Sequence, residues 1–197
     1  GACYAYLSQS GFNDIQPLTN LYLGPALSPG DISSILDQAS AEGYNISKFS
    51  NDRAVELLIQ GKVIGRCCGR MEFGARALGN RSIIADPRKR STVKIINDKI
   101  KNRDFWMPFA PSIMAEHVNE YILNTKNIFS PFMTIGFEST TKGATLLEAG
   151  SHPSDSTLRP QMVCKEDNPA YHALIETFYK KTGCPMVLNT SLNLMGD

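Results

Sequence analysis

The chain has 197 residues, of which 42% are hydrophobic and 20% are charged, and its formal net charge at pH 7 is +1. This composition is that of an ordinary globular protein, and the near-neutral charge argues against a general nucleic-acid binder, because such domains are usually strongly basic. The length predicts one domain or two small ones. No apolar run approaches the roughly 18 residues of a membrane span, and no basic-then-apolar leader is visible, so we expect a cytoplasmic protein that does not enter the membrane.

The cysteines predict neither a disulfide framework nor a zinc site. Their number is odd, two are adjacent, and no Cys-x-x-Cys pair occurs. The five are Cys3, Cys67, Cys68, Cys164 and Cys184. We therefore expect buried free thiols in a reducing cytosol. The three histidines lie far apart in sequence, so we predict no metal site.

Residues 1–30 have little periodicity and are expected to connect a missing N-terminal domain to the folded domain, residues 31–197. We expect both ends of the chain to be cuts within a longer protein, since it begins without Met and stops directly after a strand-like run. Asp31 is expected to cap a helix that Gly43 ends. The apolar stripe of this helix recurs at helical spacing and consists of Ile32, Ile35, Leu36 and Ala39.

Alternating apolar residues over 44–49 predict a strand. Ser50 or Asn51 is expected to cap the next helix, which Gly61 ends, and residues 62–68 predict a second strand. Strand, helix and strand in this order indicate a crossover unit in an α/β or α+β sheet.

Residues 69–82 are a loop rich in glycine and arginine, with apolar strands predicted on both sides. Three glycines lie five residues apart, at 69, 74 and 79, and glycine lets a ligand approach the backbone closely. The arginines of this stretch and just beyond it are Arg70, Arg76, Arg81 and Arg88. An arginine offers a planar fork of donors that matches phosphate or carboxylate oxygens. We predict a site for a small, highly charged anion, the alternative being a solvated turn whose arginines pair with Glu72 and Asp86.

Ser91 or Thr92 is expected to open a helix with an apolar stripe at Val93, Ile96 and Ile100. Its polar face consists of Lys94, Asn97, Asp98, Lys101 and Arg103. Asn97 and Lys101 are four residues apart and so project together. This face either looks into the arginine-rich loop or is a solvated charged face.

Further elements follow toward the C-terminus. We expect strands at 109–114, 130–137, 158–164 and 185–189, a short helix at 116–123, and a loop at 140–156. Asp167 or Asn168 with Pro169 starts the clearest helix, which ends at Gly183. Ser130 is a candidate phosphate donor, although a serine at a strand start more often caps a turn. His152, Asp155 and Arg159 suit either a site or a structural loop network.

From the residues alone, this is an α/β-type domain with a rigid cationic pocket. It shows no nucleophile–base pair, no Walker-type loop and no dinucleotide glycine fingerprint. Such a pocket suits chemistry that proceeds by positioning and charge neutralisation, as in phosphoryl or nucleotidyl transfer.

Several motifs carry a resemblance to a known family. The run Gly-Arg-Met-Glu-Phe-Gly-Ala-Arg-Ala-Leu-Gly-Asn-Arg-Ser at 69–82, the segment 97–112 and Asn-Thr-Ser-Leu-Asn at 189–193 resemble the carbamoyltransferases that include nodulation protein NodU and antibiotic carbamoyltransferases. The resemblance extends from about residue 23 to residue 193. Ala75 stands where the family usually has Pro, and Met107 where it often has Arg, so a contact made by that arginine would be missing here.

The resemblance implies the C-terminal domain of such an enzyme, with a YrdC-like, twisted mixed sheet flanked by helices. It implies activation of carbamoyl phosphate with ATP to give carbamoyl-adenylate and pyrophosphate. The adenylate would pass to the missing N-terminal domain, whose metal lies outside this chain. Two alternatives stay open: a non-catalytic anion- or nucleotide-binding module that regulates or docks on that domain, and association with RNA, because YrdC-like domains also occur in tRNA modification.

The two substrates bring roughly five or six negative charges together, so cations must screen their repulsion. The predicted catalytic residues are Arg76, Arg81, Lys101 and Arg103. The predicted substrate- or nucleotide-binding residues are Arg70, Glu72, Asn80, Ser82, Arg88, Asn97 and Ser130. Glu72 is expected either to orient an arginine or to hold a magnesium ion.

Overall fold

The computed structural model describes residues 2–16, 18–101, 109–147 and 157–193. Its centre is a five-stranded mixed sheet with strand order β1-β2-β7-β3-β6. The strands are β1 (Ile64–Cys67), β2 (Arg81–Ala85), β3 (Ala110–Met114), β6 (Gln161–Val163) and β7 (Met186–Ser191). All neighbours are antiparallel except β3 and β6, which are parallel. A small second sheet pairs β4 (Phe137–Glu138) with β5 (Thr157–Leu158).

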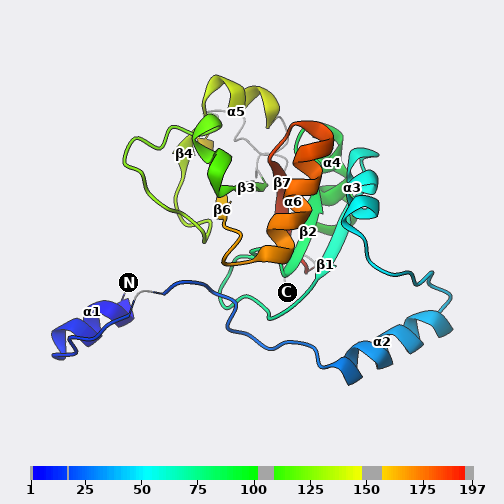
Figure 1. The fold of residues 1–197 in the computed structure, drawn as a ribbon, viewed down its shortest axis with the longest axis horizontal. Helices are drawn as coiled ribbons and strands as arrows, with labels where there is room; N and C mark the ends of the chain where they lie inside the picture. The colour runs from blue at the N-terminus through cyan, green and yellow to red at the C-terminus, as the bar shows by residue number, and fades with distance from the viewer. Residues whose placement is uncertain (1, 17, 102–108, 148–156, 194–197) are drawn as a thin grey trace.

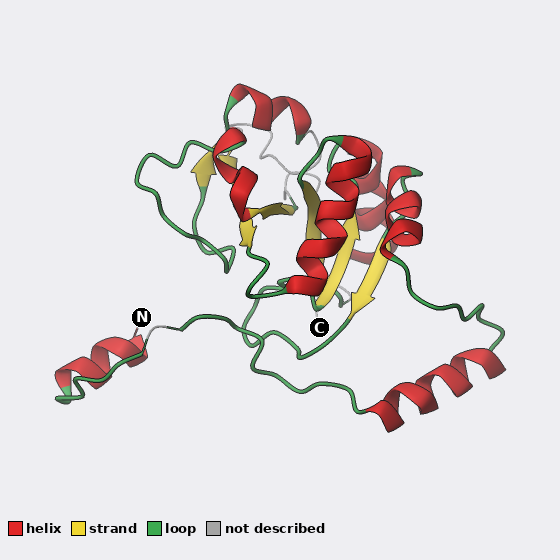
Figure 2. Cartoon of the chain, viewed as in Figure 1, coloured by secondary structure: helices red, strands yellow, loops and turns green. Residues whose placement is uncertain are grey.

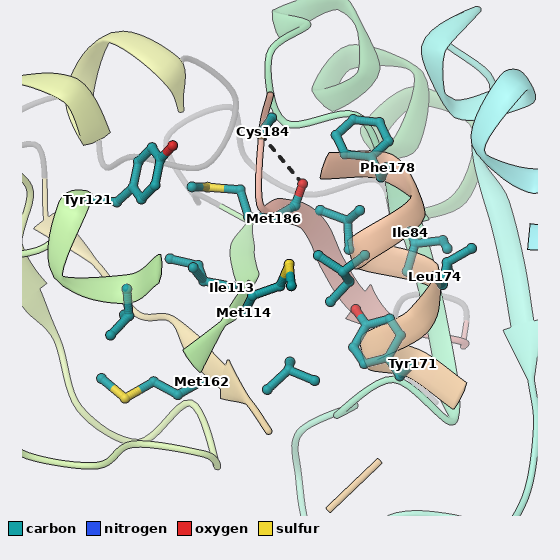
Figure 3. Close-up of a cluster of buried hydrophobic side chains, with 14 of the residues drawn as sticks. Ile84, Ile113, Met114, Tyr121, Met162, Tyr171, Leu174, Phe178, Cys184 and Met186 are labelled. Carbon is teal, nitrogen blue, oxygen red and sulfur yellow. Dashed lines mark hydrogen bonds between the residues drawn. The ribbon is translucent and has the colours of Figure 1, made fainter. Parts of the chain in front are cut away.

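Helices cover both faces of the large sheet (Figure 2). Adjacent residues of a strand point to opposite faces. Ile84 of β2 therefore packs in one core cluster with α3 (Asn51–Ile59) and α6 (Pro169–Thr182), as Figure 3 shows for α6. Ile83 packs on the other face against α4 (Arg90–Ile96), which continues as a π-helix, η1 (Asn97–Lys101). The predicted fold class, a mixed sheet flanked by helices, is confirmed.

The helices predicted around 50–60 and 168–183 are confirmed by their caps. Ser50 caps α3, and Asn168 caps α6 by accepting a hydrogen bond from the Tyr171 N–H. Gly183 ends α6 in the left-handed conformation, at φ 72°, which glycine adopts without strain. Both helices bury one apolar face, which consists of Ala54, Val55 and Leu58 in α3 and of Tyr171, Leu174, Ile175 and Phe178 in α6.

Three predicted elements are wrong. Residues 44–49 form no strand, so the predicted crossover unit does not exist. The strand predicted at 130–137 is reduced to β4, because Met133 has a positive φ of 55° that interrupts extended structure. The loop predicted at 140–156 contains a helix, α5 (Thr141–Leu146), which Thr140 caps. The short helix predicted at 116–123 is a 3₁₀ helix, η2 (Ala115–Glu120).

Two N-terminal helices, α1 (Ala2–Gln9) and α2 (Pro29–Ala41), lie away from the sheet (Figure 1). The cap of α2 corrects a prediction: Ser28 is the N-cap, and Asp31 is the partner that completes a capping box. None of the described helices has the length and hydropathy of a membrane span. The described cysteines are free thiols, but only Cys184 is buried, and Cys3 and Cys67 are exposed, which corrects the prediction of buried thiols.

Candidate functional site

The loop between β1 and β2, residues 69–82, is called the arginine loop below, and its backbone is held by one carboxylate. Glu72 is buried, and its Oε1 accepts hydrogen bonds from the N–H groups of Leu78 (2.7 Å), Asn80 (2.7 Å) and Arg81 (3.3 Å). The carboxylate therefore fixes the loop backbone, a role that the sequence did not indicate. The two roles predicted for Glu72, orienting an arginine or holding magnesium, stay predictions.

Two other predicted binding residues also hold the loop together. Ser82 Oγ accepts from the Gly79 N–H at 2.9 Å. Asn80 Nδ2 donates to the Arg70 carbonyl at 2.8 Å, and Asn80 Oδ1 accepts from Asn168 Nδ2 at 2.9 Å. Asn168 is the N-cap of α6, so these amides join the arginine loop to the start of that helix.

Two of the loop's three arginines donate to backbone carbonyls. Arg70 Nη2 and Nε bind the carbonyls of Leu23 (2.7 Å) and Gly24 (3.0 Å). Arg81 Nη1 binds the Cys68 carbonyl at 3.0 Å and that of Asn80 at 2.9 Å, with Nη2 at 3.2 Å from the Gly69 carbonyl. Part of the donor capacity of both guanidinium groups is therefore used within the chain.

Arg76 differs from these two arginines. Its side chain is exposed, and within the described residues no hydrogen bond or ion pair involves it. The loop backbone is held after Arg76 by the Glu72 contacts and before it by the hydrogen bond from the Phe73 N–H to the Leu21 carbonyl. Of the three arginines in the loop, Arg76 is thus the one whose donors face solvent unpaired.

Arg88 is not brought together with the other arginines. It follows the far end of β2, where its Nη2 and Nε bind the two carboxylate oxygens of buried Asp86 at 2.7 and 2.9 Å. Hydrogen bonding to Asp86 raises the pKa of Arg88. Its guanidinium also lies over the Phe178 ring, with 5.3 Å to the centroid. The pairing with Asp86 is the alternative that the sequence left open.

Asn97 and Lys101 do not lie on a solvated face, although Lys94 and Asp98 do. Both are buried, and Lys101 is only 1% exposed. Lys101 Nζ donates to Ser191 Oγ (3.1 Å) and to the Asn193 side chain (Oδ1, 2.7 Å). Ser191 pairs with Ser82 in the sheet, so the ammonium group lies close to the end of the arginine loop.

The remaining predicted residues are scattered or not described. Ser130 is buried. Its carbonyl accepts from the N–H of Met162 in β6 (3.0 Å), its N–H donates to Met162 Sδ (3.2 Å), and its Oγ has no partner among the described residues. Arg159 is exposed. Arg103, Met107, His152 and Asp155 lie outside the described residues.

The sequence did not single out a buried polar network beneath the arginine loop. Ser112 of β3 donates to Gln161 Oε1 of β6 at 2.7 Å, and Asn189 Nδ2 of β7 donates to Ser112 Oγ at 3.0 Å. The network reaches the loop, since Asn189 also donates to the Ala77 carbonyl (3.0 Å) and Gln161 to the Leu78 carbonyl (2.8 Å). Polar residues inside predicted buried strands were the signal.

Some buried atoms of this region lack a hydrogen-bond partner within the described parts of the chain: Arg66 Nε and Nη2, Tyr171 Oη and Asn189 Oδ1. Arg66 lies over the Tyr171 ring, with Cζ 5.5 Å from its centroid. Burial raises the pKa of Tyr171. Unpaired buried polar atoms are costly, so these three side chains are candidate ligand contacts. An arginine inside a predicted strand was the signal for Arg66.

Comparison with known proteins places these features in a family context. A family model described as "Carbamoyltransferase C-terminus" matches residues 55–197. Nodulation protein NolNO of Sinorhizobium fredii is 40% identical over 182 residues, which cover 89% of this chain and 26% of that protein. The 3'-hydroxymethylcephem-O-carbamoyltransferase of Amycolatopsis lactamdurans is 31% identical over 149 residues, 76% of this chain and 28% of that protein.

The fold has a counterpart among solved structures. The crystal structure of full-length HypF in its phosphate- and nucleotide-bound form matches with a TM-score of 0.53 at 13% identity, over 79% of this chain and 18% of that one. At that identity the likeness concerns the fold alone. The chain spans about a third, or less, of the length of the curated relatives that it matches.

Proposed function

This chain belongs to the carbamoyltransferase family and corresponds to the C-terminal domain of its members. We propose that the domain binds ATP and carbamoyl phosphate and forms carbamoyl-adenylate. The name of the Amycolatopsis relative supports carbamoyl transfer, and the nucleotide- and phosphate-bound HypF neighbour supports a nucleotide site on this fold. A YrdC-like assignment and a cytoplasmic location are part of the same proposal.

The proposed reaction consumes one water molecule. The P–O bond of carbamoyl phosphate breaks, water takes the phosphoryl group as orthophosphate, and carbamate is left. A carbamate oxygen then attacks the α-phosphorus of ATP, and pyrophosphate leaves with the electron pair of the broken P–O bond. Because the products carry as much negative charge as the reactants, cations are needed throughout.

The observation that carries the proposal is Arg76, an unpaired guanidinium on a loop whose backbone is fixed by Glu72. A cation carried by an anchored backbone segment stays near the charge that it stabilises, which reduces the reorganisation needed during the reaction. We assign Arg76 to the phosphates. Lys101, whose ammonium donates to Ser191 and to two oxygens of Asn193, would act on the same anion through its charge rather than through a direct hydrogen bond. Arg70 and Arg81 hold the loop through hydrogen bonds to backbone carbonyls, so only their remaining N–H groups could bind the anion.

The proposal needs two components that this chain does not supply: a magnesium ion and a domain for the transfer step. Among the described residues no group of three His, Cys, Asp or Glu side chains is placed to hold a metal ion, so we propose that magnesium enters bound to the ATP phosphates. The transfer step, with its metal, is assigned to a separate N-terminal domain of the longer protein. The final acceptor of the carbamoyl group would be set by that domain.

Pyrophosphate release tests this proposal, with ATP and carbamoyl phosphate each omitted in turn. Release is expected only when both are present, in the longer protein and, if the domain acts alone, in this chain. Arg76→Ala should reduce the rate at least 100-fold, of the order seen when one stabilising donor is removed, with an unchanged unfolding midpoint. Arg53→Ala, which removes an exposed arginine of α3, is the matched control. Normal release by Arg76→Ala would remove this residue from the mechanism.

Arg70 and Arg81 use donors for hydrogen bonds within the chain, and this favours a second candidate function. The domain would then be a non-catalytic module that binds a nucleotide or another anion and regulates the rest of the protein. ATP binding measured by calorimetry, without pyrophosphate release in either the chain or the longer protein, would identify this case.

A further inference from the structure

The helix α2 exposes an apolar face although it is well formed. Pro29 opens the helix, and the Ser28–Asp31 capping box satisfies its first N–H groups. The apolar face consists of Ile32, Ile35 and Leu36, whose exposed fractions are 45%, 50% and 43%. No residue of α2 is buried, so the described part of the chain does not cover this face.

A helix of this length is not stable in water by itself. Isolated helices shorter than about 12–15 residues are marginal even in favourable sequences, and most helical stability in proteins comes from packing an apolar face. α2 has 13 residues. The segments beside it expose further large apolar side chains: Leu27, Tyr44, Ile46 and Phe49. Large apolar side chains exposed together along one segment mark a contact with another protein surface.

The comparisons indicate which surface this is. The match to NolNO covers 89% of this chain, so about 22 of the 197 residues lie outside it. Even if all the unmatched residues are at the N-terminus, α2, which begins at Pro29, lies within the matched region. The family match to the carbamoyltransferase C-terminus begins only at residue 55. The relative is about four times longer than the matched part. We infer that the apolar face of α2 packs on the preceding part of the longer polypeptide.

The connection between α1 and α2 gives this interface a second property. Residues 21–25, called the strap below, bind the arginine loop through Gly24 N–H to the Met71 carbonyl (2.9 Å), Met71 N–H to the Pro25 carbonyl (2.9 Å) and Phe73 N–H to the Leu21 carbonyl (2.7 Å). Arg70 donates to two strap carbonyls as well. The strap therefore connects the arginine loop to the segment that carries α2. Since we infer that α2 packs on the preceding part of the polypeptide, the arginine loop would lie near the boundary between that part and this domain.

Hydrogen exchange in the longer protein tests this inference, with Ile35→Asp as the variant. Ser34→Asp is the matched control, because it puts the same charge one residue away, off the apolar face. Amides of residues 29–41 should exchange slowly in the parent and in Ser34→Asp. In Ile35→Asp they should exchange at the rate of an unfolded peptide, while amides of α6 keep their protection.

Three results would overturn the inference. Fast exchange of 29–41 in the parent protein would show that the face is uncovered, and full protection in Ile35→Asp would show that this face is not what covers the helix. If sedimentation shows a dimer that Ile35→Asp alone dissociates, a second copy of the chain is the occupant. None of these readouts requires turnover, so a failure of the proposed function is distinguishable from a failure of this interface.

Discussion

At the scale of single residues, the arginine loop depends on a buried carboxylate rather than on its arginines. Glu72 accepts three backbone hydrogen bonds, and bonds to an ionised acceptor are roughly twice as strong as neutral ones. We expect Glu72→Gln to lower the free energy of unfolding by about 2 kcal/mol, measured by urea denaturation. The exposed Glu138 provides the control, Glu138→Gln, which should change it by less than about 0.5 kcal/mol. Equal stabilities would contradict this role.

The sequence predicted where the charged residues of the loop lie, but not what each contacts. The spacing of arginines and glycines indicated a rigid cationic loop, and the loop is indeed held at many points. The spacing cannot distinguish Arg76, which is unpaired, from Arg81, which binds carbonyls of its own loop. That difference depends on how the loop backbone folds back on β1, and no local sequence pattern determines this path.

At the scale of elements, the arginine loop is packed against α6 at Gly79. A Cβ on Gly79 would lie 2.3 Å from the Tyr171 ring, and the residue has a φ of 112°. Gly74 has a φ of 126°, but nothing lies within 4 Å of the position that a Cβ would take there. Gly74→Ala should therefore cost only the backbone strain, about 1–2 kcal/mol, and Gly79→Ala about 2 kcal/mol more. Thermal unfolding of the two variants measures the difference, and equal costs would show that the loop can shift away from α6.

Elements with local end signals were predicted well, and elements that depend on a partner were not. Ser50 and Asn168 are the N-caps of α3 and α6, Gly183 is the C-cap of α6, and each lies where the sequence predicted a cap. Residues 44–49 alternate like a strand, but a strand needs a neighbour to satisfy its backbone groups. No described strand pairs with that segment, and its large apolar residues Tyr44, Ile46 and Phe49 are exposed. Burial of Lys101 likewise depends on Ser191, ninety residues away.

At the scale of the whole molecule, the folded core of the described residues contains no residue of the two N-terminal helices. Both faces of the sheet are covered, and the larger cluster joins α3, α6 and the strands. This core also contains two acidic groups, Cys184 and Tyr171, whose pKa burial raises, so that they keep their protons to higher pH than in an unfolded chain. Cys184 has no exposed surface, and burial raises its pKa from 9.0 to about 12. Its Sγ approaches the Met186 carbonyl at 3.6 Å (Figure 3).

The raised pKa of Cys184 predicts a loss of stability in alkaline solution. Below pH 9 the thiol is protonated in both states, so its contribution is fully present. Between pH 9 and about 12 the unfolded chain releases this proton and the folded chain keeps it. The free energy of unfolding should therefore fall by about 1.4 kcal/mol per pH unit from this group. Urea denaturation between pH 8.5 and 9.5, where an unfolded tyrosine with its ordinary pKa of 10.0 is still largely protonated, measures the slope. Because this window is centred on the ordinary thiol pKa of 9.0, Cys184→Ala should flatten the slope by about half a proton, whereas Cys67→Ala, at an exposed thiol, should not. An unchanged slope in Cys184→Ala would show that another group carries the alkaline sensitivity.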